Sequence, residues 1–344
     1  MTVPHVATSF RLVNPSLRSC WIVYLSAALI SSLLGDSVIL VSSIGYNAIK
    51  LNPFLVTIIQ HLAVCDILSA VVFVLPTLVS LIADKWVLGT PLAYLHLYMN
   101  QCTYQINNYL ISILVCSKLL RLRFPHRTKS FDGKLAHVVC GVVWVLALIY
   151  PAVRLSFDQH GVVFSYINYN IDCGISSEYT DADTVLMYLF VAVIGVVPFL
   201  LVLGITVGTL FHLIGAWKSS KTCGGEVRWQ GIVTVVATAT VHCISSLPDM
   251  AGITATLTLS TLALHTMVTI RRVGEAMNAL NIMANFYIYF LAVPSFRTFV
   301  MGLVSGFCGK IAGKMASLCG RNTNNQIINV ENATTEELFS MTKF

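Results

Sequence analysis

Apolar residues of this chain are gathered into long runs that are separated by short polar connections. A helix needs roughly 20 residues to cross a bilayer, and the runs reach that length without the alternation of about 10-residue barrel strands. The pattern therefore predicts membrane-spanning helices. The runs lie near residues 20–46, 54–82, 91–122, 135–153, 184–216, 230–253 and 269–293.

Composition agrees with helices in a bilayer. Of the 344 residues, 56% are hydrophobic and 10% are charged, whereas soluble domains average roughly 45–50% apolar and about 25% charged residues. The seven runs predict an all-α membrane protein built as a seven-transmembrane helix bundle. Residues 254–270 are also fairly apolar, so an eighth short or re-entrant segment stays an alternative.

Lys and Arg residues between the runs predict the orientation, because basic loops are retained on the cytoplasmic side. With the N-terminus outside, ten basic loop residues lie inside and four lie outside, although the flanks of the first run alone point weakly the other way. We therefore expect a multi-pass plasma-membrane protein with an extracellular N-terminus. The inner residues are Lys50, Lys118, Arg121, Arg123, Arg127, Lys129, Lys134, Lys218, Lys221 and Arg228, and the outer ones are Lys85, Arg154, Arg271 and Arg272.

The runs and the two tails predict four segments. Residues 1–19 form an extracellular N-terminus without the apolar core of a cleavable signal peptide, and residues 20–293 form the transmembrane domain. Residues 294–315 mix apolar and basic side chains as a short amphipathic eighth helix at the membrane surface does. The polar residues 316–344 predict a disordered cytoplasmic tail.

Motifs of enzymes and metalloproteins are not found along the chain. We see no metal-ligand spacing, Walker loop or nucleophile elbow. We therefore expect no enzyme activity, no catalytic residues, no organic cofactor and no nucleic-acid partner. The cysteines are scattered and are expected to act mostly as small apolar fillers, whereas Cys308 and Cys319 are candidates for palmitoylation.

Short motifs follow one another along the runs. Residues 62–66 read Leu-Ala-Val-Cys-Asp, residues 86–89 read Trp-Val-Leu-Gly, and residues 285–289 read Asn-Phe-Tyr-Ile-Tyr. In this order, and over roughly residues 20–310, the motifs resemble those of rhodopsin-like (class A) G-protein-coupled receptors, loosely the invertebrate neuropeptide receptors. Single residues that match the family are Trp144, Pro198, Pro248, Phe296 and Arg297.

The resemblance implies a receptor that transduces an extracellular ligand, a neuropeptide or another small molecule, to a heterotrimeric G protein. Arrestin and membrane lipids are further implied partners. The resemblance leaves open two other classes, a non-signalling or decoy binding receptor and a chemosensory receptor for a small molecule. A proton-coupled transporter is a third alternative, which the odd number of runs without a repeat disfavours. The residues implied in G-protein contact and activation are Lys118, Arg121, Arg123, Pro248 and Tyr289.

The third run departs most from the family. The family's Asp-Arg-Tyr triplet falls on residues 117–119, which read Ser-Lys-Leu. A rival register on residues 126–128 uses Cys102 as the outer disulfide cysteine, but it draws basic residues into the membrane, where each costs about 3 kcal/mol. The first register puts Ala93 at the disulfide position, so we expect Cys173 to lack its usual partner. Lysine keeps the charge of the family's arginine without its planar fork, so altered coupling is expected.

Two acids, Asp36 and Asp66, lie in the middle of predicted spans. Ionisable residues within a membrane are rare and mark ion or proton sites. Two carboxylates in one dry site cannot both ionise at low cost, so we expect a shared proton or a sodium ion at Asp66. The resemblance adds Asn107, Asn281 and Asn285 to this site. The alternative is that a protonated Asp36 hydrogen-bonds across helices as structural glue.

Amide and hydroxyl side chains line the outer half of the third run. Asn100 and Tyr104 share one helical face, and Gln101 and Gln105 share the next. Such a polar stripe predicts a ligand cavity, to which two acids of later runs could add negative charge, or else amide hydrogen bonds between helices. The ligand-binding candidates are Asn100, Gln101, Tyr104, Gln105, Asp249 and Glu275.

The connections carry charge of opposite sign on the two sides. Residues 154–183 hold five acids and one arginine, which either attract a basic or amidated peptide or form an ordinary solvated loop. Residues 118–134 hold six basic residues and one acid. That inner charge is explained by attraction to anionic lipid or by contact with a G protein.

Overall fold

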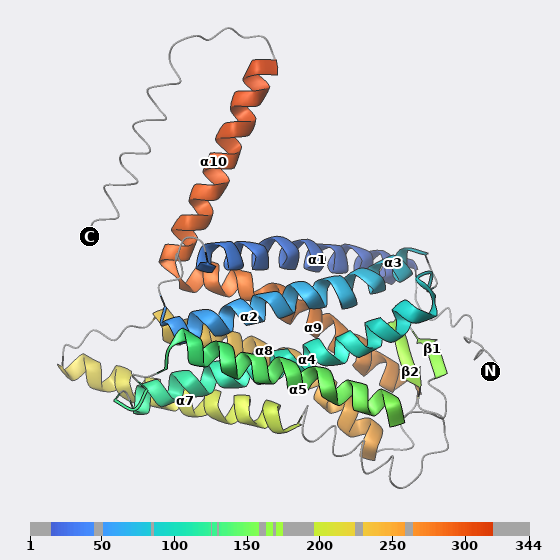
Figure 1. The fold of residues 1–344 in the computed structure, drawn as a ribbon, viewed down its shortest axis with the longest axis horizontal. Coiled ribbons are helices and arrows are strands. Elements are labelled where there is room, and N and C mark those ends of the chain that lie inside the picture. Colours follow the sequence, from blue (N-terminus) through green and yellow to red (C-terminus); the bar gives the residue numbers. More distant parts are fainter. Residues whose placement is uncertain are drawn as a thin grey trace. The chain divides into compact units, whose positions relative to one another are not determined.

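We describe the protein from a computed structural model of the full chain. The chain divides into two compact units, residues 1–297 and 298–344, and each is considered by itself. The described part is predominantly helical (Figure 1), as the long apolar runs predict. The described residues are 15–44, 51–83, 86–124, 126–128, 131–157, 163–167, 170–174, 196–223, 230–258 and 264–318.

Within the described residues the helices coincide with the predicted runs and extend beyond several of them, whereas residues 45–46 and 184–195 of the predicted runs lie outside the described residues. Helix α2 (Pro53–Ser69) begins at Asn52, whose Oδ1 accepts a 3.0 Å hydrogen bond from the Phe54 N–H, which is a favoured helix start. It continues through a π-helical turn, η1 (Ala70–Val74), into α3 (Leu75–Ala83). The other helices are α1 (Pro15–Ile44), α4 (Gly89–Arg123), α5 (Gly133–Phe157), α7 (Val197–Cys223), α8 (Gln230–Thr258), α9 (Leu264–Ala292) and α10 (Pro294–Leu318).

A short hairpin interrupts the connection that the sequence predicts to be an acidic loop. Strand β1 (Val163–Ile167) pairs antiparallel with β2 (Asn170–Gly174), and Phe164 stands opposite Cys173. The pattern of apolar runs does not predict these strands, because five residues are too few to form a run of membrane-spanning length.

The long helices of the unit formed by residues 1–297 pack side by side (Figure 1). Helix α1 packs against α2 and α9, and α9 packs against α8. Helix α8 contacts α7, and α7 contacts α4. Since α4 also packs against α2, these contacts close a ring, with α5 lying against α2 and α4.

The protein combines exposed apolar side chains with buried acidic ones, which is unusual for a water-soluble protein. Large apolar side chains such as Leu34, Leu146 and Phe211 are 65%, 61% and 72% exposed. The carboxylates of Asp36 and Asp66 are 0% exposed. A soluble chain almost never buries acids while exposing so many apolar residues. The exposed apolar side chains suit contact with lipid, and the buried acids lie away from it.

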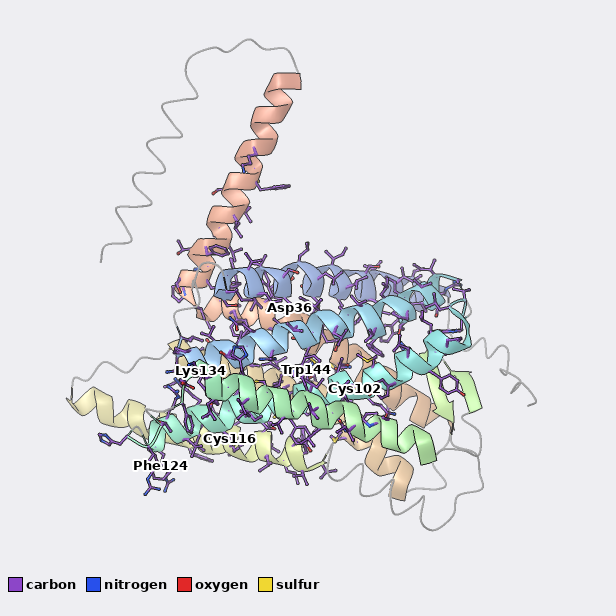
Figure 2. The ribbon with its side chains drawn as sticks, in the orientation of Figure 1. Asp36, Cys102, Cys116, Phe124, Lys134 and Trp144 are labelled. Carbon is purple, nitrogen blue, oxygen red and sulfur yellow. The ribbon has the colours of Figure 1, made fainter. Side chains whose placement is uncertain are left out.

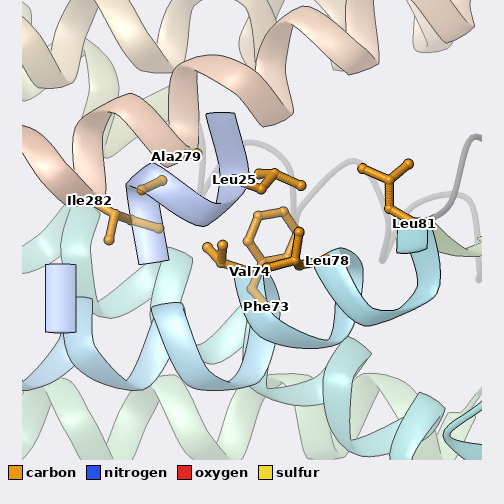
Figure 3. Packing of buried hydrophobic residues seen from close by; sticks show 8 residues of the cluster. Leu25, Phe73, Val74, Leu78, Leu81, Ala279 and Ile282 are labelled. Carbon is orange, nitrogen blue, oxygen red and sulfur yellow. The ribbon is translucent and has the colours of Figure 1, made fainter. Parts of the chain in front are cut away.

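An apolar cluster holds α1 against η1, α3 and α9 (Figure 3). Phe73 of the π-helical turn is 3% exposed and lies at its centre, between side chains of the other elements. Between helices in a bilayer, such a cluster stabilises by van der Waals packing, because lipid tails are as apolar as the side chains themselves. The cluster consists of Leu25, Ala28, Phe73, Val74, Leu78, Leu81, Ala279 and Ile282.

Two helical segments of the described chain are long and apolar enough to cross a membrane, Arg18–Ile44 and Pro53–Ala83. A third qualifies if Ala276–Ala292 and Pro294–Lys310 form one broken span. Shorter apolar helical stretches occur at Gly133–Ile149, Val197–Phe211 and Ile232–Pro248. The chain thus has the character of a helical membrane protein, and the remaining spans stay a prediction.

Candidate functional site

Asp66 is the centre of a buried polar core. It lies on α2 and is 0% exposed. Asn107 on α4 donates from Nδ2 to Oδ1 over 3.0 Å, and Asn285 on α9 donates from Nδ2 to Oδ2 over 2.6 Å. Each carboxyl oxygen therefore accepts one amide hydrogen bond, which offsets part of the cost of burying the carboxyl group. The same two bonds tie α2 to α4 and to α9.

Asp36 on α1 has a different environment. It is also 0% exposed, and it lies close enough to Asp66 for the two carboxyl groups to interact electrostatically. Ser32, one turn earlier on the same helix, donates to its Oδ2 over 2.7 Å. Oδ1 is buried without a hydrogen-bond partner. A buried oxygen without a donor is unfavourable, so Oδ1 is the atom at which a proton or a cation would stabilise the site.

The hydrogen bond of Asp36 concerns the alternative in which a protonated Asp36 links two helices. Its hydrogen bond to Ser32 stays within α1, and no bond from Asp36 to another helix is seen among the described residues. A sequence search could have found Ser32, because a serine four residues before an intramembrane acid shares its helical face.

Tyr289 and Thr238 extend the polar core to α8. Tyr289 on α9 is 1% exposed, and its hydroxyl lies beside that of Thr238, without the geometry of a hydrogen bond. Asn281 is buried one turn before Asn285. The structure therefore gathers polar groups from α1, α2, α4, α8 and α9, and α8 is the contributor that sequence reasoning missed.

The donor set of this core fits a small hard cation. Carboxylate and amide oxygens are the ligands that such ions take, and Oδ1 of Asp36 and Oδ1 of Asn107 are both buried without a partner. No group of three or more His, Cys, Asp or Glu side chains suited to a metal occurs in the described part of the chain.

The outer polar stripe of α4 faces the interior of the helices. Gln105 is 2% exposed, whereas Asn100, Gln101 and Tyr104 are half-buried. Oε1 of Gln101 is buried and has no hydrogen-bond partner, so it is available to a donor on a ligand or another helix. The backbones of Asp249 and Glu275 lie in α8 and α9, and their side chains are outside the described residues.

The interior part of α8 carries buried polar side chains. His242 and Ser246 are 2% and 6% exposed, whereas the resemblance to rhodopsin-like receptors implies phenylalanine and tryptophan at these positions. Nδ1 of His242 is buried without a partner. Pro248 lies inside α8 and is half-buried.

Residues predicted to contact a G protein differ in their surroundings. Arg121 donates from Nη2 to the Phe131 carbonyl over 2.7 Å, and its guanidinium lies 5.8 Å from the Phe131 ring centroid. Phe131 in turn packs against Phe54 of α2. Arg121 therefore holds the connection between α4 and α5, a role that the sequence did not suggest. Lys118 is half-buried and Arg123 is exposed.

The rival register in α4 would use Cys102 as its outer disulfide cysteine. Cys102 is buried and free in the structure. Ala93 is buried. The side chain of Cys173 in β2 lies outside the described residues, as does Cys319. Cys308 on α10 is exposed and free.

No protein-family model matches the chain, and no curated protein matches it. The resemblance to rhodopsin-like receptors therefore depends on the motifs of the sequence itself. Two of those motifs, residues 62–66 and 285–289, meet in the structure through the hydrogen bond between Asp66 and Asn285.

Proposed function

We propose that the chain is a divergent rhodopsin-like receptor of the plasma membrane, with seven transmembrane helices and an extracellular N-terminus. It transmits the binding of an extracellular ligand, which we infer to be a neuropeptide, to a heterotrimeric G protein. The observation that carries the proposal is the hydrogen bond from Asn285 to Asp66, because it joins two motifs 219 residues apart in sequence. Motifs that matched by chance would have no reason to meet.

Ligand recognition is assigned to the outer half of the interior. The polar stripe of α4 contains Asn100, Gln101 and Tyr104, whose side chains are half-buried. Amide and hydroxyl side chains can hydrogen-bond to amide groups, which a peptide supplies. Opening of α8 at Pro248 would then admit the G protein on the inner side.

A binding receptor that does not signal is the second candidate, and two observations favour it. Lys118 replaces the arginine of the family triplet, so the planar donor fork is lost. Phe286 replaces the proline of the last motif, and α9 runs as unbroken helix through it. Both changes affect the elements through which family members transmit activation.

The test uses the full-length chain in cells that also express a promiscuous G protein. A library of amidated peptides and small metabolites is screened by second-messenger response, and each active compound is tested for direct binding. We expect at least one saturable response that is changed by Asp66→Asn while surface expression is kept. A compound that binds saturably without activating any G protein would instead establish the non-signalling receptor.

A further inference from the structure

The inner end of α4 carries an exposed aromatic ring with two cations close to it. The guanidinium carbon of Arg123 lies 6.0 Å from the Phe124 ring centroid, and that of Arg127 lies 5.8 Å from the same centroid. The Phe124 side chain is 42% exposed, and both arginines are exposed. We call these three residues the Arg-Phe-Arg patch.

The backbone fixes the patch in one turn. The Phe124 N–H donates to the Leu120 carbonyl over 2.7 Å. The Phe124 carbonyl then accepts from the Arg127 N–H over 3.2 Å and from the Thr128 N–H over 3.3 Å. The Thr128 hydroxyl donates to the same carbonyl over 3.1 Å. The two arginines are therefore held on one ring by the turn and not only by their own side chains.

The charges of the patch have no acidic partner among the described residues. The acid nearest in sequence, Asp132, accepts a 2.8 Å hydrogen bond from the Leu135 N–H and thereby caps α5. The neighbouring cation Arg121 turns towards the Phe131 carbonyl. Arg123 and Arg127 thus present ten N–H donors to the surroundings, five from each guanidinium.

We propose that the Arg-Phe-Arg patch binds the phosphorylated headgroup of an anionic membrane lipid. Guanidinium groups bind phosphate oxygens in pairs. Each guanidinium lies within about 6 Å of one centroid, so the two are close enough to contact the phosphates of a single inositol phosphate headgroup. An exposed aromatic ring at the end of a membrane helix suits the headgroup region, where such rings gather.

The position of the patch favours a lipid over a soluble partner. Phe124 lies at the same end of the helices as Lys134 (Figure 2), and the basic residues of this end are those that the orientation places inside. The inner leaflet carries the anionic lipids and attracts juxtamembrane basic residues. The proposal concerns lipid binding alone, so it can hold whether or not the chain signals.

The experiment measures binding of a short-chain phosphatidylinositol bisphosphate to the purified full-length protein in neutral detergent. Arg123→Gln and Lys134→Gln each remove one positive charge from the same end, so they form a matched pair. We expect Arg123→Gln to weaken binding about five-fold and Arg123→Gln with Arg127→Gln about 25-fold. Lys134→Gln should stay within about two-fold of the wild type. Equal losses in Arg123→Gln and Lys134→Gln would show unspecific attraction and overturn the proposal.

Two further measurements separate the lipid from other sources of phosphate. Phe124→Ala should weaken binding of the lipid more than binding of free inositol trisphosphate, because both lose the ring that holds the arginines but only the lipid also loses an apolar contact. Free inositol trisphosphate that binds as tightly as the lipid would overturn the assignment to a lipid. Thermal denaturation of every variant without lipid checks folding, and variants that melt with the wild type are the ones compared.

Discussion

Gly35 on α1 lies against Phe286 on α9 so closely that an added Cβ would stand 2.7 Å from the Phe286 Cβ. The Phe286 Cβ is fixed to its backbone, so α1 and α9 would have to move apart to make room. The Phe286 ring also packs edge-on against Phe296, with centroids 5.9 Å apart. Phe286 thus packs α9 against Gly35 of α1 and against Phe296, at the position where the family resemblance implies a proline.

The first prediction concerns this contact. Gly35→Ala should lower the free energy of unfolding by about 1–3 kcal/mol, because a well-packed helix contact is overfilled. Thermal denaturation in detergent measures it. Gly141→Ala on α5 is the control, since an added Cβ there meets nothing within 4 Å, and it should be neutral or slightly stabilising. Equal melting of both variants would contradict the contact.

Arg18 is predicted to clamp α1 to the end of α3. Its Nε and Nη2 donate to the carbonyls of Leu81 and Ile82, each over 2.9 Å. A positive charge is favoured at a helix C-terminus. Arg18→Lys keeps the charge but loses the fork, so both Arg18→Lys and Arg18→Ala should lower stability, by about 1 kcal/mol or more. If denaturation of Arg18→Ala matches the wild type, the clamp contributes nothing.

His61 of α2 and His137 of α5 form the next testable pair. His61 Nε2 and His137 Nδ1 are 3.2 Å apart, so one imidazole donates while the other accepts. Two protonated rings repel each other and neither can accept, so acid should weaken the contact between α2 and α5. His137→Ala should cost about 1 kcal/mol at neutral pH and reduce the acid sensitivity of melting. His126 lies in an exposed turn, so His126→Ala should change neither the stability at neutral pH nor the acid sensitivity of melting.

The acid pair predicts competition between protons and sodium. In the wild type, a proton on the pair should oppose sodium binding. Asp36→Asn removes one acid while Asp66 keeps its donors Asn107 and Asn285, so this variant should bind sodium more tightly and depend less on pH. Melting is measured against sodium concentration at two pH values, with Asp66→Asn as the variant that should not respond. Identical curves for wild type and Asp36→Asn would leave Asp36 as a structural residue.

Orientation is the last prediction. An epitope tag before residue 1 should be stained on intact cells, whereas a tag after residue 344 should be stained only after permeabilisation. The reason is that this orientation keeps ten basic loop residues inside. Staining of the C-terminal tag alone on intact cells would reverse the orientation and, with it, the assignment of the Arg-Phe-Arg patch to the inner leaflet.

The sequence by itself determined the helical character of this protein and the approximate extent of its helices. Run length and hydropathy are local properties, and a helix satisfies its own backbone hydrogen bonds in lipid. The sequence also placed Asp36 and Asp66 in the interior, because a charge facing lipid is too costly. It predicted Asn107 and Asn285 near Asp66 only through the family resemblance.

Only the tertiary structure decided which of these groups touch. It gave both oxygens of Asp66 an amide donor but bonded Asp36 to Ser32 on its own helix. It turned Arg121 towards Phe131 and left Arg123 and Arg127 on the exposed ring of Phe124. Such contacts depend on the rotation of each helix about its axis and on side-chain rotamers. Both are set by packing between segments far apart in the chain, which no local pattern records.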